Sequence, residues 1–475
     1  MPISVSCFSR FFRFSVLAVL SAAVLCVQAS EPGEDATMPE DLLPELKTLL
    51  ISALRQSPQM VQSEISISQA EAARYASSAQ LLPQVVANAS FAWNRISAEK
   101  AVPPGGFRPG EPRTSEDKSS GPYYGVSMNQ PVFTWFALSN QVKIADIAIK
   151  ISEKSYADAY RSLANVIRTQ YLGLIFQKVS LRNQRFSLKQ TERLLELDEA
   201  RLKSGAMSPA ELIQPRAAFA FARLAMARSD ELYGRSRRQL ARLSGVDSID
   251  GEKIPLEAPK WTASAGASAR LAARMQRDGV ESTFAGQINA LRIKDADLNY
   301  KIASTRLYPK FSLSASVSQY NSQNVTASSV TQQAAFSTTY GVSASWTIFD
   351  GFAARGAKRY ALANKRIYEQ QQKLLAAQLS EQISSTVQLI DFSATAVEMA
   401  ETSRVGALVG VERISDEFKR GVVTEDVVAS FTSQLFSQEA SVVAARIELL
   451  NRWCELVSAV GADPILSQIP ARYAK

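Results

Sequence analysis

The chain has 475 residues, with 53 Lys and Arg, 45 Asp and Glu, three Cys and no His. A hydrophobic content of 46% excludes a disordered chain, and a mean hydropathy of −0.07 excludes a protein built from many membrane helices. The absence of His excludes His-ligated zinc hydrolases and Ser-His or Cys-His triads, and a net charge of +8 is too diffuse to indicate a nucleic-acid partner.

The N-terminus has the three parts of an export signal. Arg10 and Arg13 precede an apolar run at residues 16–27, and Ala29 closes a short cleavage site. This order predicts a cleavable signal peptide over residues 1–29, since the run is too short for a membrane helix. Lipidation at Cys26 is not expected, because Leu25 stands where a lipobox needs a small residue. The exported chain then keeps Cys454 alone and forms no internal disulfide.

The sequence contains two copies of one unit, at residues 30–247 and 248–463, followed by a tail at 464–475. Tyr-Gly-Val-Ser begins at Tyr124 and again at Tyr340, 216 positions later. A gapless offset of this kind is evidence of tandem duplication. It also relates Phe133 to Phe349, Phe136 to Phe352, Gly205 to Gly421 and Gly245 to Gly461.

Each unit is expected to contribute two strands, at about 84–96 and 123–133 and at about 310–319 and 339–349. Apolar and small polar residues alternate in all four, as in strands that face lipid on one side and water on the other. The alternative is a pair of ordinary hairpins on a soluble core. Residues 97–122 and 319–339 are expected to form exposed loops, the first facing outside. Several aromatic residues are predicted near the membrane interfaces: Trp93, Tyr124, Trp135, Tyr308, Tyr320, Tyr340 and Trp346.

Long helices follow each strand pair. Residues 140–203 contain only helix formers apart from Gly173, which corresponds to about 96 Å of helix. A heptad row indicates lengthwise packing against other helices, although a dimeric coiled coil would share that pattern: Ile167, Leu174, Leu181, Leu188, Leu195 and Leu202. Two long hairpins are predicted, at about 140–244 and 353–460. The first turns at Gly205, and a capping box of Ser208, Pro209 and Glu211 is expected to start its return helix.

The order of these features resembles the TolC family of bacterial outer-membrane efflux and secretion proteins. The resemblance rests on the Leu82-Pro83 and Tyr308-Pro309 pairs, the two Tyr-Gly-Val-Ser strands and the two glycine turns. It implies a mainly helical protein with membrane β-structure, in which a tandem-duplicated unit gives long helical hairpins and four strands per chain. Three chains then form a trimeric α-barrel joined to a shared transmembrane β-barrel.

The resemblance also places the hairpin turns at the periplasmic tips, where an adaptor protein docks. The expected contact residues are Gly205, Ala206, Met207, Ser208, Gly421, Val422, Val423 and Thr424. Glu425 and Asp426 form a possible acidic ring at the entrance, favouring cations. The alternative is that both are acids at a solvated helix start, where they complement the helix dipole.

The predicted function is that of a trimeric outer-membrane exit duct for efflux or type I secretion. The implied partners are two further copies of the chain, a periplasmic adaptor (membrane fusion) protein, an inner-membrane pump or ABC transporter, and outer-membrane lipid, with no nucleic acid. No enzyme activity, cofactor or metal is expected, because Walker, Rossmann and metal-ligand motifs are missing from the sequence. The alternative function is a periplasm-spanning coiled-coil scaffold without a channel.

Overall fold

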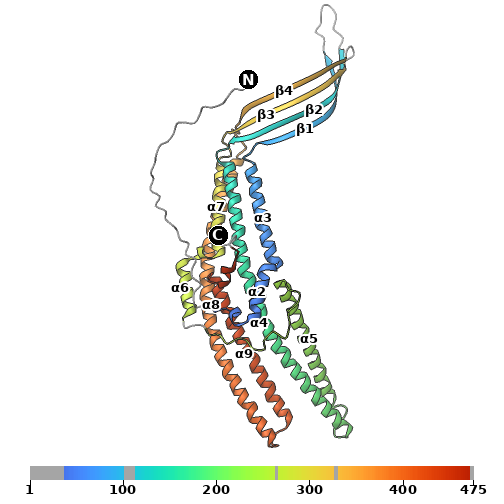
Figure 1. Ribbon diagram of the computed structural model, residues 1–475, viewed down its shortest axis with the longest axis vertical. Helices are drawn as coiled ribbons and strands as arrows, with labels where there is room; N and C mark the ends of the chain where they lie inside the picture. The colour runs from blue at the N-terminus through green and yellow to red at the C-terminus, as the bar shows by residue number, and fades with distance from the viewer. Residues whose placement is uncertain (1–36, 101–112, 263–265, 326–329, 471–475) are drawn as a thin grey trace, which may run out of the picture.

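The computed structural model describes residues 37–100, 113–262, 266–325 and 330–470. The expected signal peptide and the last residues of the tail lie outside this part. A four-stranded sheet forms one end of an elongated molecule, and the tips of two helical hairpins form the other (Figure 1). The chain is mainly helical with one antiparallel sheet. The fold class predicted from the sequence is therefore confirmed.

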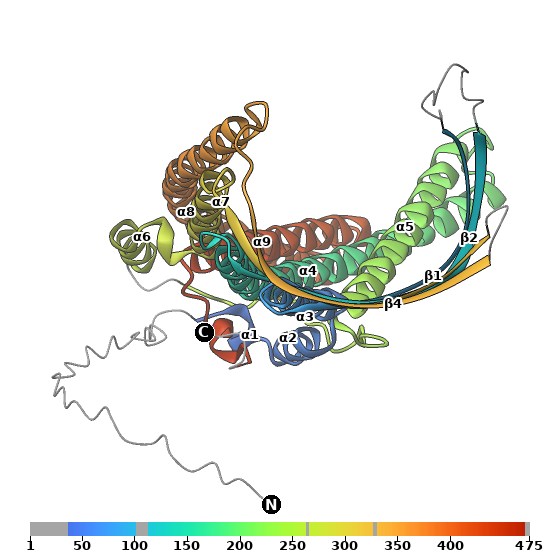
Figure 2. The same ribbon diagram turned by 90° about the horizontal axis from the view of Figure 1, so that it is seen from above.

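The sheet consists of β1 (Gln84–Lys100), β2 (Arg113–Phe133), β3 (Lys310–Val325) and β4 (Val330–Ser345). The strands pair in chain order, so the two repeat units meet where β2 pairs with β3. Seen from above, the sheet is a curved wall (Figure 2). Strands β1 and β4 lie at its edges, and neither has a second partner among the described residues.

The strands are longer than the sequence patterns predicted, which corrects the two expected loops. All of the described residues in 97–122 continue β1 and β2, and all of those in 319–339 continue β3 and β4. Strand β4 ends earlier than expected, at Ser345. The apolar alternation stops before the backbone pairing does, because strand ends that leave an apolar environment no longer need apolar side chains. Residues 101–112 lie outside the described chain.

Two helices of 67 residues run from the sheet to the tips: α4 (Ala137–Lys203) and α8 (Ala353–Lys419). Helices α3 (Pro58–Ala79) and α5 (Ile213–Ser244) lie along α4, and α7 (Phe284–Ser304) and α9 (Glu425–Ala459) lie along α8. Two shorter helices thus accompany each long one. In the part of the chain that the structure describes, no helix has a stretch apolar enough to cross a membrane.

The junctions between sheet and long helices repeat in backbone detail. Phe136 and Phe352 precede α4 and α8 with φ of 63° and 66°, a left-handed conformation that is rare for non-glycine residues. Nearby, Trp135 Nε1 donates to the Pro309 carbonyl at 2.7 Å, and Trp346 Nε1 donates to the Leu307 carbonyl at 3.0 Å. Matching strain in both copies supports the duplication and fixes the direction in which each long helix leaves the sheet.

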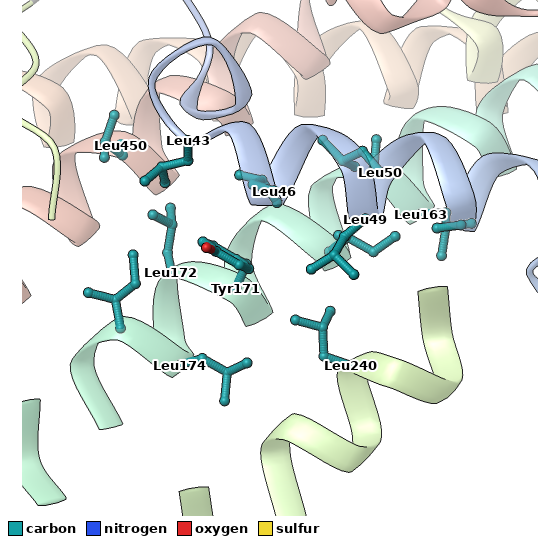
Figure 3. Packing of buried hydrophobic residues seen from close by; sticks show 14 of the residues in the cluster. Leu43, Leu46, Leu49, Leu50, Leu163, Tyr171, Leu172, Leu174, Leu240 and Leu450 are labelled. Carbon is teal, nitrogen blue, oxygen red and sulfur yellow. The ribbon is translucent and has the colours of Figure 1, made fainter. Parts of the chain in front are cut away.

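The core lies midway along the molecule. The short helix α2 (Pro44–Gln56), which follows α1 (Pro39–Leu42), packs there against α4, with α5 and α9 completing the cluster. Leu46 of α2 lies over Tyr171 of α4, and Leu43 lies beside Leu172 (Figure 3). The first three residues of the predicted heptad row, Ile167, Leu174 and Leu181, are buried. The remaining elements are α6 (Ala267–Asp278) and the 3₁₀ helices η1 (Val280–Ser282) and η2 (Pro464–Gln468).

A buried ion cluster joins the first and last parts of the chain within this core. The guanidinium of Arg168 is fully buried and donates from Nε to Glu40 at 2.9 Å and from Nη2 to Asp463 at 2.9 Å. Burial alone would lower the pKa of Arg168, but the two carboxylates raise it. The guanidinium therefore stays charged, and each carboxylate depends on it for compensation.

Candidate functional site

One face of the sheet is apolar. Backbone register places apolar side chains of all four strands in shared rows, because alternate residues of a strand share a face. These side chains are well exposed in the single chain; Trp93 is 78% and Tyr340 is 84% exposed. Its apolar residues are Val85, Ala87, Ala89, Phe91, Trp93, Pro122, Tyr124, Val126, Met128, Leu313, Ala315, Val317, Phe336, Tyr340 and Val342, and the polar residues Gln319 and Thr338 lie in the same rows.

The opposite face, here called the hydroxyl face, has mostly small polar side chains. Its rows contain Asn88, Ser90, Ser127, Asn129, Ser312, Ser314, Ser316, Ser318, Ser337, Thr339 and Ser343. The hydroxyls of Ser312 and Ser343 lie 2.8 Å apart across β3 and β4. From the level of Ser312 to that of Tyr320, this face has no charged residue among those whose side chains the structure describes. It therefore suits contact with water but not with lipid.

The predicted interface aromatics separate into two groups. Trp93, Tyr124 and Tyr340 lie on the apolar face. Tyr340 lies in the same cross-strand row as Val85 of β1, and Trp93 lies eight residues farther along β1. Eight residues of strand span about 26 Å, close to the apolar band of a membrane sheet. Trp135, Tyr308 and Trp346 lie instead at the junction with the helices. Tyr320 of β3 differs from both groups, since it lies on the hydroxyl face.

Both hairpin tips end their long helix in the same way. The amide of Ala206 donates to the main-chain carbonyl of Arg201 at 2.9 Å, and the amide of Val422 donates to the main-chain carbonyl of Glu417 at 3.0 Å. These bonds, with Gly205 and Gly421 at φ of 75° and 74°, form Schellman motifs, which need a residue in the left-handed region. The tips therefore have a defined shape. Seven of the eight predicted contact residues lie in the turns between the helices of each hairpin, and Thr424 occupies the N-cap position of α9 without a side-chain capping hydrogen bond.

The start of the first return helix differs from the prediction. Ser208 and Glu211 make both capping-box hydrogen bonds. The Ser208 amide donates to the Glu211 carboxylate at 2.8 Å, and the Glu211 amide donates to the Ser208 hydroxyl at 3.4 Å. The segment that they hold is an isolated turn, however, and α5 begins only at Ile213. Pro215 interrupts the helix start, because it has no amide hydrogen to donate to the Glu211 carbonyl four residues earlier.

Contacts between α4 and α9 join the two hairpins toward the tips. Arg182 pairs with Glu439 at 2.6 Å, and the rings of Phe186 and Phe436 meet edge to face at 4.9 Å. The series ends at the tip with an ion pair between Arg193 and Glu425, in which both carboxylate oxygens accept hydrogen bonds. The sequence did not indicate Arg193, since its partner lies 232 residues away.

The acidic pair at the tip of the second hairpin is thus divided. Glu425 is compensated by Arg193 of the same chain, whereas Asp426 has no ion-pair partner among the described residues. Both occupy the first turn of α9, where the helix dipole favours negative charge. The geometry supports a structural part for Glu425 and leaves Asp426 as the freer charge at the tip.

No grouping suited to a metal ion, with three or more carboxylates or thiols together, occurs in the described ranges. Cys454 is buried in α9, and burial raises the pKa of its thiol to about 12. A thiol of this kind stays protonated and unreactive at neutral pH. The two faces of the sheet and the hairpin tips are the candidate functional surfaces among the described residues.

Comparison with solved structures places the fold among outer-membrane channels. The CmeC channel of Campylobacter jejuni aligns with a TM-score of 0.64 at 15% identity, over 90% of this chain and 89% of CmeC. VceC of Vibrio cholerae aligns with a TM-score of 0.62 at 16% identity, over 88% and 96%. The open-state MtrE channel of Neisseria gonorrhoeae gives 0.62 at 14%, over 88% and 89%.

Sequence comparison agrees. The pyoverdine export outer membrane protein OpmQ of Pseudomonas aeruginosa is 25% identical over 278 residues, which are 58% of this chain and 56% of OpmQ. The match thus spans about half the length of that relative. The model of the outer membrane efflux protein family matches residues 49–246 and 287–462, which cover most of both repeat units. The resemblance to TolC-like proteins is confirmed, and the chain belongs to the outer membrane efflux protein family.

Proposed function

We propose that three copies of this chain form a passive exit duct across the outer membrane. The observation that carries the proposal is the sheet, which has one apolar face, one hydroxyl face and two edge strands that pair with no second strand in the described part of the chain. In lipid, unpaired strand edges leave backbone amides and carbonyls without hydrogen bonds. Pairing of β4 of one chain with β1 of the next would satisfy them, with the apolar face toward lipid and the hydroxyl face toward a water-filled pore.

A stripe on α8 supports the assembly below the sheet. Tyr360, Ile367 and Leu374 recur at heptad spacing and remain exposed in the single chain. A different side of α8 contacts α7. There Lys365 forms an ion pair with Asp297, and the main-chain carbonyl of Tyr368 accepts a hydrogen bond from the Asn289 side chain. The stripe therefore faces away from the helices of its own chain. A neighbouring copy would cover it, as in a tube of helices packed lengthwise.

Substituting two residues of this stripe should weaken the assembly. An Ile367→Glu, Leu374→Glu variant is expected to lose most of its trimer in mild detergent, because two carboxylates would replace apolar contacts at each of three interfaces. Light scattering of purified protein measures the mass, and circular dichroism checks that the helices remain. A variant that stays fully trimeric would contradict the proposed packing. Native protein that is soluble without detergent, and never conducts, would favour the scaffold function instead.

The hairpin tips are proposed as the periplasmic entrance and the docking surface for an adaptor protein, which would connect the duct to an inner-membrane pump or ABC transporter. Their support is position, since both tips lie at the end opposite the sheet (Figure 1), and exposure, since Val422 projects with 70% of its surface accessible. The export function of the relative OpmQ makes small molecules the first cargo class to test. Residues 1–29 would direct the chain to export.

The charges at the proposed entrance predict that two variants change the cation preference of the pore in opposite directions. Reconstituted Glu425→Gln, Asp426→Asn protein is expected to prefer cations less than the native pore, and Arg193→Gln protein is expected to prefer them more, since removal of Arg193 uncovers Glu425. Reversal potentials in a salt gradient measure this. Unchanged selectivity in both variants would end the idea of an acidic ring and leave the acids as helix-start residues. Stability should change by less than about 1 kcal/mol, as is usual for exposed pairs.

A further inference from the structure

Two tyrosines interrupt the hydroxyl face of the sheet. Tyr123 of β2 lies directly opposite Tyr320 of β3, and the same cross-strand row contains Ser90 and Ala335. Between Ser312 and Tyr320, the other described side chains of this face are small or of medium size and uncharged. The two rings are therefore the only aromatic surface that the described part of this face offers.

Glycine makes room for one of these rings. Tyr123 is flanked on its own face by Gly121 and Gly125. A Cβ atom placed on Gly125 would lie 2.8 Å from the Tyr123 hydroxyl and 3.1 Å from the adjoining ring carbon. The ring thus extends along the strand over Gly125 and covers the backbone there. A ring in this position turns part of its π-face outward, and Tyr123 and Tyr320 remain 39% and 42% exposed.

We infer that Tyr123 and Tyr320 form an aromatic contact patch on the pore wall, at which planar aromatic cargo is briefly retained. The inference rests on the proposed duct, in which the hydroxyl face lines the pore and three patches lie at one level. Exposed aromatic faces bind flat rings by offset stacking and attract cations to the ring face. The serines around them offer hydrogen bonds but no competing charge, so the patch selects for aromatic shape.

Single-channel recording tests the patch with a flat aromatic cation, ethidium, and with tetrapropylammonium as a cation that has no ring. The full-length mature protein is reconstituted in a bilayer. Both cations are added to the side on which the sheet end of the protein lies. Ethidium should cause transient blockades that a Tyr123→Ser, Tyr320→Ser variant shortens by about fivefold to tenfold, the effect expected for loss of ring contacts. A matched Tyr123→Phe, Tyr320→Phe variant keeps the rings and should keep the blockades. Tetrapropylammonium should behave alike in all three proteins.

The outcomes separate the patch from the duct. If the native pore conducts but ethidium is retained no longer than tetrapropylammonium, or equally long in the Ser variant, the patch is overturned and the duct stands. If the native protein forms no pore, both proposals fall. Open-pore conductance shows whether each variant has assembled, and the Phe variant provides the comparison should the Ser variant not fold.

Discussion

A Val126→Arg variant should largely fail to enter the outer membrane. Val126 lies in the middle of the apolar face, opposite Ala87 on β1 and Val317 on β3. An Arg on the lipid side of a membrane strand costs about 2–4 kcal/mol near the bilayer midplane. Three copies would multiply that cost in a trimer. The measurement is the fraction of chain recovered as heat-resistant trimer from outer membranes.

The neighbouring residue supplies the matched control. Ser127→Arg adds the same side chain to the same strand, but on the hydroxyl face. Its charge would be solvated in the pore, so insertion should persist, and the selectivity of the pore should shift toward anions. Equal loss of insertion in both variants, or loss with Ser127→Arg alone, would contradict the assignment of the two faces.

An Arg168→Met variant is expected to lose about 3–5 kcal/mol in the free energy of unfolding, as is typical when one partner of a buried ion cluster is removed. Arg168 and Asp463 have no exposed side-chain surface, so Asp463 would keep a buried charge without its partner, and Glu40 would share this loss. The methionine fills a comparable volume, which separates the loss of charge from a loss of packing. Urea unfolding of the purified protein measures the change.

An exposed pair tests whether burial is the cause. Arg185 and Asp230 form an ion pair with 59% and 57% of their side chains exposed. Arg185→Met should therefore change the free energy of unfolding by less than about 1 kcal/mol. Similar losses for the two variants would show that the buried cluster contributes no more than a surface pair.

Periodicity made most of the fold predictable from the sequence. The gapless repeat, the heptad row through Ile167 and Leu174, and the glycine at each helix end all correspond to features of the structure. The ends of the strands were not predictable, because side-chain alternation reports on the environment of a strand and backbone pairing continues beyond it. Residues such as Ser119 and Ser120 read as a loop but pair with β1 and β3.

The candidate site was predictable in outline only. The alternation defined both faces of the sheet, but the side on which Tyr320 lies depended on extending β3 beyond residue 319. The ion pair of Arg193 and Glu425 joins residues that only the packing of α4 against α9 brings together. Arg168 did leave a signal, since it stands four residues before Leu172 on a buried helix face. A charge within an apolar row indicates a buried partner, although not which one.

The pairing of the strands in chain order constrains how the molecule folds. Hairpins β1–β2 and β3–β4 close over short segments, whereas Tyr123 and Tyr320 become neighbours only after the intervening chain has folded back. Closing a long loop costs more conformational entropy than forming a local contact, so pairings between distant segments form late. The seam between the two halves of the sheet is therefore expected to be the slow step of folding, completed after each hairpin has formed on its own.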